Sequence, residues 1–81
     1  MTVRVLYFAS LKDYTGTAEE SIEIAETENV AALWTALQRK HPRLASLLFR
    51  PMAACDLNYA SWDRSLLGVS EVAFLPPVSG G

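Results

Sequence analysis

One amphipathic helix with strand patterns on both sides of it most constrains the fold of this chain. The apolar residues of the helix recur at spacings of three and four: Val30, Leu33, Trp34 and Leu37. This spacing is typical of a single buried helix face. Asn29 precedes the run as a predicted N-cap, and Pro42 should end it because a residue before proline disfavours helical geometry. A sheet must therefore cover this helix.

Five segments have the composition or alternation of strands: 3–9, 21–24, 52–55, 59–62 and 71–75. Thr15-Gly16-Thr17 predicts a turn that brings the second strand back beside the first. Leu44, Leu47 and Leu48 predict a short second helical stretch before Pro51. We therefore expect an α+β fold over residues 1–75, in which a mixed sheet packs on one main helix.

The size and charge of the chain exclude several classes of protein. Its 81 residues allow one small domain. The net charge is -2 and the basic residues are scattered, whereas nucleic-acid binding needs clustered Lys and Arg. A single cysteine, Cys55, excludes an internal disulfide. We see neither a signal-peptide pattern nor an apolar run long enough to cross a membrane, so we expect a cytoplasmic protein.

Alternation along the first and last strands predicts an exposed apolar patch. Arg4 marks the outer face of the first strand, and this face also carries Phe8. Glu71 marks the outer face of the last strand, which also carries Leu75. If the two strands are parallel neighbours, their apolar ends lie together on the outer face, and such patches often bind partner proteins. The alternative is that a loop or the second helical stretch covers Phe8.

The sequence offers no self-sufficient catalytic or metal site. His41 has neither an acid nor a nucleophile near it in the sequence, and we expect it at a solvated helix terminus. One Cys and one His are too few for a typical metal site. Cys55 should be a small buried hydrophobe, and Asp56 and Asp63 should be separate surface carboxylates. We therefore expect no bound cofactor.

The chain ends in an apolar segment, "FLPPVSGG". Pro76 and Pro77 favour an extended course, so residues 76–81 should project from the domain as a tail of roughly 20 Å. Gly80 has no Cβ and would fit a narrow channel. The functional group at the tip is the α-carboxylate of Gly81. The alternative is a frayed terminus.

This ending and the beginning of the chain resemble a known family. "EVAFLPPVSGG" is similar to the C-terminal signature of the ubiquitin-like sulfur carriers that form the small subunit of molybdopterin synthase. "VRVLYFASLKDYTGT" resembles the opening strand and turn of the same family. The resemblance covers essentially the whole chain, and it implies a β-grasp fold.

The resemblance also implies a function and partners. An adenylating enzyme activates the carboxylate of Gly81 with ATP, a sulfur donor protein supplies sulfur, and a thiocarboxylate forms. The tail, made of Pro76, Pro77, Val78, Ser79, Gly80 and Gly81, then enters the large subunit, where the sulfur passes to cyclic pyranopterin monophosphate. The two subunits are expected to form a heterotetramer. Phe8, Tyr59 and Leu75 fall where the family has apolar contacts to the large subunit.

Two short stretches depart from the family's usual pattern. This chain has Val69-Ser70 where relatives often have Gly-Asp, and Cys55-Asp56 where they often have Val-Asn. The first departure concerns a turn, and the second concerns the pairing of a strand. Three alternatives to the implied function remain open: a sulfur carrier for another pathway such as thiamine thiazole synthesis, a modifier joined to lysines of target proteins, and a β-grasp adaptor that never uses Gly81.

Overall fold

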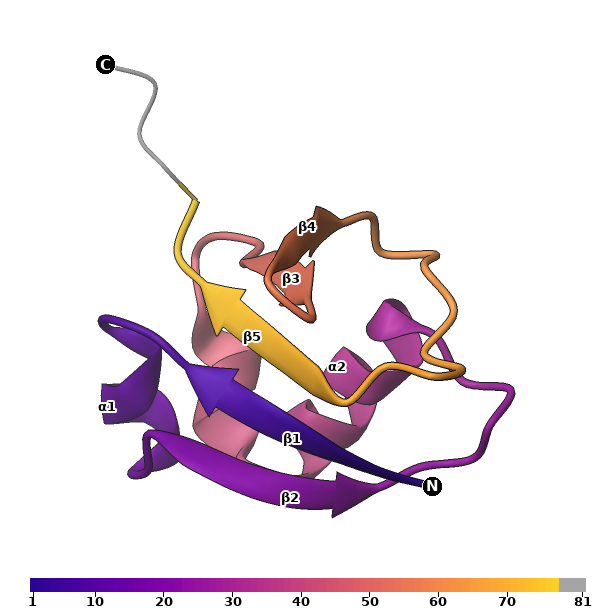
Figure 1. Cartoon of the computed structure of the whole chain (residues 1–81). Coiled ribbons are helices and arrows are strands. Elements are labelled where there is room, and N and C mark those ends of the chain that lie inside the picture. Colours follow the sequence, from indigo (N-terminus) through magenta and orange to yellow (C-terminus); the bar gives the residue numbers. More distant parts are fainter. Residues whose placement is uncertain (78–81) are drawn as a thin grey trace.

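A computed structural model describes residues 1–77 of the chain (Figure 1). Five strands, two α-helices and one 3-10 helix follow one another in the order β1 (Thr2–Tyr7), α1 (Leu11–Thr15), β2 (Glu19–Glu23), α2 (Val30–Lys40), η1 (Pro42–Ser46), β3 (Met52–Cys55), β4 (Asn58–Ala60) and β5 (Glu71–Leu75). Within this part of the chain, no helix is long and apolar enough to cross a membrane.

The five strands form one mixed sheet in the order β2-β1-β5-β3-β4. The first and last strands, β1 and β5, are parallel neighbours in the middle of the sheet. The other pairs, β1 with β2, β3 with β4 and β3 with β5, are antiparallel. Figure 1 shows α2 crossing behind the sheet, so one face of the sheet is covered and the other is open. The predicted α+β, β-grasp architecture is confirmed.

The core lies between the inner face of the sheet and α2. The inward residues of the two central strands are at most 2% exposed: Val3, Val5, Tyr7, Val72 and Phe74. The four predicted apolar residues of α2 are also buried. Asn29 caps α2 as predicted, because its Oδ1 accepts a hydrogen bond from the Ala32 N–H at 2.8 Å. The burial of the inward residues of β1 and β5 confirms the alternation predicted for both strands.

The region after β1 differs from the prediction. The strand ends at Tyr7, two residues earlier than expected, and Ala9 takes a left-handed φ of 52°. A short helix, α1, follows and buries Leu11. Gly16, at a φ of 76°, ends this helix, since glycine adopts the left-handed conformation without steric cost. The turn signal at 15–17 thus includes a helix C-cap as well as the return to β2.

Strand β4 and the second helical stretch are also displaced from their predicted positions. β4 covers Asn58–Ala60, so Trp62 lies beyond it. The Trp62 ring packs 6.0 Å from that of Trp34 and 6.2 Å from that of Phe74, which explains why the chain leaves the sheet at this point. The second helical stretch is η1, which buries Leu44, while Leu48 lies outside it and is fully exposed.

Candidate partner-binding site

A shallow groove of about 240 Å³ lies on the open face of the sheet. The residues that line it come from four of the five strands, β1, β3, β4 and β5, from the segment after β1 and from the turn between β3 and β4: Leu6, Phe8, Ala54, Leu57, Tyr59, Glu71, Ala73 and Leu75. The set includes Phe8, Tyr59 and Leu75, the three residues that the family resemblance marks as partner contacts. The structure thus brings these three side chains to one surface.

The groove follows from the pairing of small and large residues across the sheet. Leu6 pairs with Ala73, Ala73 with Ala54, and Ala54 with Tyr59, so one row of outer-face residues crosses four strands. The two alanines in the middle of the row leave a hollow between the larger Leu6 and Tyr59. Ala73 is 9% exposed although it faces outward. The outer face is therefore concave at this row.

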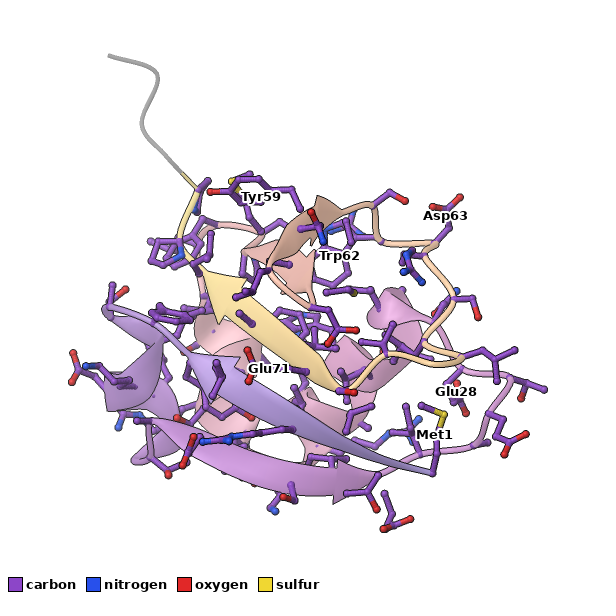
Figure 2. All side chains as sticks on the ribbon, viewed as in Figure 1. Met1, Glu28, Tyr59, Trp62, Asp63 and Glu71 are labelled. Carbon is purple, nitrogen blue, oxygen red and sulfur yellow. The ribbon has the colours of Figure 1, made fainter. Side chains whose placement is uncertain are left out.

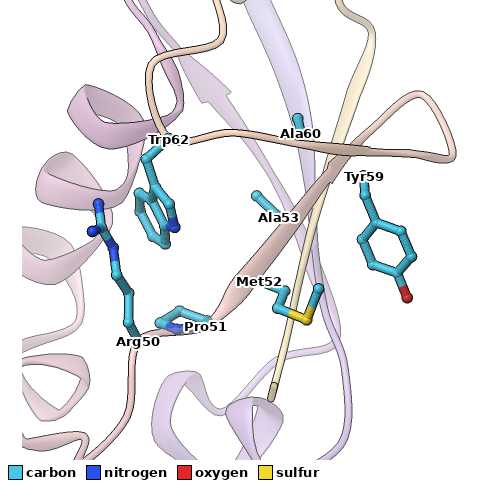
Figure 3. Close-up of a pocket in the computed structure, with 7 residues that line it drawn as sticks. All are labelled: Arg50, Pro51, Met52, Ala53, Tyr59, Ala60 and Trp62. Carbon is cyan, nitrogen blue, oxygen red and sulfur yellow. The ribbon is translucent and has the colours of Figure 1, made fainter. Parts of the chain in front are cut away.

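Aromatic side chains rise at two sides of the groove. Phe8 is 47% exposed, and its backbone is fixed by a hydrogen bond from its N–H to the Phe74 carbonyl at 3.0 Å. Neither a loop nor η1 covers it, so the alternative of a covered Phe8 is wrong. Tyr59 is 68% exposed. Figure 3 shows its ring on the opposite side of the strands from Trp62, which points toward the helices.

Charge on the open face gathers at the other end of the central strands, as the alternation predicted. The side chain of Arg4 forms an ion pair with Glu19 of the neighbouring strand. Arg4 is also the residue that pairs with Glu71 in the β1–β5 register, and Figure 2 shows Glu71 on the open face of the sheet. Arg4 and Glu71 thus place charge at the starts of β1 and β5, and Glu71 also borders the groove.

The turn between β3 and β4 is tied to the start of β5 by Asp56. Its backbone N–H donates to the Glu71 carbonyl at 2.9 Å. Its carboxylate Oδ1 accepts hydrogen bonds from the Ser70 N–H at 3.2 Å and the Glu71 N–H at 3.0 Å. The two departures from the family pattern, Cys55-Asp56 and Val69-Ser70, therefore meet in one set of hydrogen bonds that holds one edge of the groove.

A second hollow, of about 280 Å³, lies beside the edge of the sheet (Figure 3). It is lined by Arg50, Pro51, Met52, Ala53, Tyr59, Ala60 and Trp62. The Arg50 guanidinium lies 4.2 Å from the centre of the Trp62 ring, a cation–π contact. This contact fixes the segment between η1 and β3 against the core, which gives Arg50 a structural role.

A polar cluster joins β1 and β2 to the end of α2. The Glu20 carboxylate accepts hydrogen bonds from the Tyr7 hydroxyl, from His41 Nε2 and from Lys40 Nζ, each at 2.6 Å. His41 Nε2 must carry a proton to donate to a carboxylate. The His41 ring also packs edge-on against the Tyr7 ring, with centroids 6.0 Å apart.

The prediction that His41 lies at a solvated helix terminus is therefore wrong in its solvation. His41 does lie at the C-cap of α2, but its side chain is 16% exposed and is paired with Glu20. Sequence distance concealed the pair, since 21 residues separate the two. Tyr7, His41 and Lys40 all pair with Glu20, and none of the four residues lines the groove. This cluster fastens the helix to the sheet.

The environment of Glu20 sets the pKa values of the cluster. Burial raises the pKa of this carboxyl group, but hydrogen bonds from Lys40, Tyr7 and His41 more than offset it, so the pKa lies below its usual value. Burial also raises the pKa of the Tyr7 hydroxyl, and the hydrogen bond to Glu20 adds to this effect. Glu20 is thus ionised and Tyr7 protonated at neutral pH.

Cys55 is buried, as predicted. Burial raises the pKa of its thiol, so the thiol form persists at neutral pH and is a poor nucleophile. Asp56 and Asp63 have separate partners, since Asp63 accepts a hydrogen bond from the Ser61 hydroxyl. Among residues 1–77, no group of three or more His, Cys, Asp or Glu side chains is arranged to hold a metal ion.

The predicted tail begins where β5 ends, at Leu75. Pro76 and Pro77 follow without regular secondary structure. The predictions on Val78, Ser79, Gly80 and Gly81 fall outside the described residues. Leu75, the last residue of β5, also lines the groove, so the chain leaves the sheet beside it.

Comparison with known proteins places the fold and the ending in one family. Residues 5–81 match the ThiS family. The chain belongs to this family. The molybdopterin synthase sulfur carrier subunit of Homo sapiens is 33% identical over 98% of this chain and 93% of that protein. The Mycobacterium tuberculosis protein of the same name is 35% identical over 98% of this chain and 96% of its own length.

A solved structure supports the same assignment at the level of the fold. The Pyrococcus furiosus protein described as molybdopterin converting factor, subunit 1, superposes with a TM-score of 0.84 and 28% sequence identity. The match covers 96% of this chain and 99% of that one. The recognition of a sulfur-carrier family from the two ends of the sequence is thus confirmed.

Two features of the site were missed at the level of sequence. Leu57 lines the groove from the β3–β4 turn, yet its position between two short strands gave no sign of exposure. The signal available was the gap of three residues, 56–58, between the two predicted strands, which indicates a hairpin turn. The Glu20–His41 pair gave no signal, because it depends on where the end of α2 lies against β2.

Proposed function

We propose that this chain is the sulfur carrier subunit of a molybdopterin synthase. The observation that carries the proposal is similarity over the whole length to proteins of that name, including 33% identity to the human one. The match to the ThiS family extends through Gly81. In this function the carboxylate of Gly81 becomes a thiocarboxylate, whose sulfur is donated to cyclic pyranopterin monophosphate to build molybdopterin.

The chemistry requires an activated carboxylate. A carboxylate is a poor electrophile, so a carboxylate oxygen of Gly81 first attacks the α-phosphate of ATP and pyrophosphate leaves. The acyl-adenylate then has AMP as a good leaving group, and a sulfur nucleophile displaces it. An adenylating enzyme and a sulfur donor protein supply these two steps. ATP is consumed by that enzyme and is not a cofactor of this chain.

The chain contributes docking and reach to this reaction. The groove side chains Phe8, Tyr59 and Leu75 present an apolar surface next to the point where the tail begins. An apolar surface of this kind suits a partner protein, which we propose to be the large subunit. Six residues from Pro76 to Gly81 would reach roughly 20 Å from the groove if extended. The carrier thus holds the sulfur on an arm while the partner supplies catalytic groups.

The proposal is tested by changing the end of the chain. Deletion of Gly81, or addition of one residue after it, should abolish molybdopterin formation in a mixture with the large subunit, adenylating enzyme and sulfur source. Both variants should keep the parental melting temperature, because the change lies beyond the last strand. A thiocarboxylate on the parent replaces one carboxyl oxygen with sulfur, and intact mass spectrometry detects the resulting gain in mass.

The outcomes separate the proposal from its alternatives. Normal molybdopterin synthesis by either variant would refute a role for Gly81. A thiocarboxylate that supports thiazole formation instead of molybdopterin formation would assign the chain to the other sulfur pathway. Lysine conjugates that form without a pterin substrate would identify a protein modifier. A parent that never gains sulfur but binds partners through the sheet would be an adaptor.

A further inference from the structure

The two-residue turn between β3 and β4 has an unusual residue at its second position. Cys55 pairs with Asn58, so Asp56 and Leu57 alone form the turn. Both have positive φ, 47° for Asp56 and 73° for Leu57. Two positive φ values are the arrangement of a type I′ turn, where Asn-Gly and Asp-Gly are the favoured pairs. Aspartate suits its position, whereas leucine takes a place that favours glycine.

A leucine in this conformation is sterically disfavoured, because its Cβ lies close to the backbone. Its own contacts do not compensate, since the side chain is 90% exposed. The hydrogen bonds from the Ser70 and Glu71 N–H groups to the Asp56 carboxylate offset the backbone strain at Asp56. They involve no atom of Leu57. The folded domain alone therefore gives no reason for leucine at position 57.

The location of Leu57 supplies a reason. It lines the same groove as Phe8, Tyr59 and Leu75, and it lies in the turn that Asp56 fastens to the start of β5. Strained backbone positions tend to occur at binding sites, where the strain is offset by function. An exposed leucine next to aromatic side chains extends the apolar surface of the groove beyond its strands.

We propose that Leu57 is an anchor residue for the large subunit, inserted into an apolar pocket of that partner, and this inference rests on the proposed function. The occupant follows from the groove, since Leu57 is continuous with the side chains that flank the start of the tail. Two proteins must receive the tail, the adenylating enzyme and the large subunit. A strongly apolar anchor suits the longer-lived of two complexes, and the relatives are named as subunits of the synthase.

The inference predicts effects of opposite sign on stability and on binding. Leu57→Gly removes both the strain and the side chain, so the melting temperature should rise by roughly 2 to 6 °C. The same variant should bind the large subunit about tenfold or more weakly, as expected for loss of an apolar anchor. Leu57→Met keeps an apolar side chain of similar size and should bind within about threefold of the parent.

Leu48→Ala is a matched control. Leu48 is a fully exposed leucine that does not line the groove, and its φ is not positive. Its replacement should change the dissociation constant by less than about twofold. Calorimetry of the large subunit titrated with each variant, together with thermal unfolding of each carrier, gives the two readouts. Adenylate formation by the activating enzyme is measured beside them and should stay at the parental rate for Leu57→Gly.

Each other outcome overturns the inference in a distinct way. If Leu57→Gly binds as tightly as the parent, Leu57 is not an anchor. If its melting temperature falls, the leucine serves the fold. If adenylation slows while large-subunit affinity is unchanged, the anchor belongs to the activating enzyme. If the parent itself does not bind the large subunit, the proposed function fails and this inference fails with it.

Discussion

The two faces of the sheet are built from the same strands, but their large side chains differ in burial. On the inner face, Phe74 is fully buried and lies 5.0 Å from the Trp34 ring. On the outer face, Phe8 and Tyr59 are exposed, and Leu57 has a positive φ, which is unfavourable for leucine. The inner face is complete within this chain, whereas we propose that a second protein covers the outer face.

Exposure and backbone strain, more than hydrophobicity, distinguish the outer face that we propose binds a partner. Both faces of the sheet carry apolar side chains. Ala73 on the outer face, at 9% exposure, is nearly as buried as residues of the core. What distinguishes the outer face is that its large side chains stand at the sides of a hollow floored by Ala54 and Ala73. Substitutions on the two faces should therefore separate stability from binding.

The largest expected effect comes from a matched pair of phenylalanine substitutions. Phe74→Ala should lower the free energy of unfolding by about 3–5 kcal/mol, because it opens a cavity between α2 and the sheet. Phe8→Ala should lower it by less than about 1 kcal/mol but weaken large-subunit binding. Chemical denaturation and calorimetric titration measure the two quantities. Equal losses of stability in both variants would remove the distinction between the faces.

A substitution at Glu20 tests how much the polar cluster beside the core contributes to stability. Glu20→Gln leaves Tyr7, His41 and Lys40 without their shared carboxylate, and should cost about 1–3 kcal/mol of stability at neutral pH. The folded-state pKa of Glu20 is below its usual value, so its contribution is present above the unfolded-state pKa. The contribution is lost as the pH falls through the folded-state pKa.

Denaturant unfolding of the parent and of Glu20→Gln across a pH series measures this contribution. The difference in stability between them should shrink as the pH falls from about 5 to below the usual glutamate pKa of about 4.3. Binding to the large subunit at neutral pH should stay close to the parental value, because Glu20 does not line the groove. A difference in stability that is the same at every pH would show that the charge of Glu20 is unimportant.

The smallest expected effect on stability comes from Asp56, in the turn between β3 and β4 at the edge of the outer face. Asp56→Ala removes the acceptor of the Ser70 and Glu71 N–H groups and should cost about 1 kcal/mol of stability. It should also weaken large-subunit binding, because the turn that carries Leu57 is no longer held against β5. Hydrogen exchange of the Ser70 and Glu71 amides reports the loss directly. Unchanged protection of both amides would show that the carboxylate does not hold the turn.

The sequence was informative where local pattern and burial agree. The spacing of Val30, Leu33 and Trp34 predicted α2, and alternation placed Val72 and Phe74 inward. In each case the residues that define the secondary structure are also the residues that the core buries. The ends of β1 and β4 were misplaced, since they depend on tertiary packing. Trp62 leaves the sheet to join Trp34 and Phe74, which no local pattern records.

The candidate site was predicted in outline and missed in detail. Charge alternation placed Phe8 and Leu75 on the outer face, and the family resemblance added Tyr59. Leu57 was missed because its significance lies in a backbone angle, and the Glu20–His41 pair because it joins residues far apart in the chain. The roles of Pro76, Pro77 and the four residues after them remain predictions that the tests above address.

The sheet order has a consequence for how the domain is made. β5 is the last strand to be synthesised, yet it lies in the middle, between β1 and β3. Before β5 arrives, the nascent chain holds two hairpins, β1–β2 and β3–β4, that share no strand pairing. A product cut before Glu71 cannot close the sheet, because only β5 joins the two hairpins, through its pairing with β1 and with β3. Truncated products therefore lack Glu71, Ala73 and Leu75 of the groove as well as the tail.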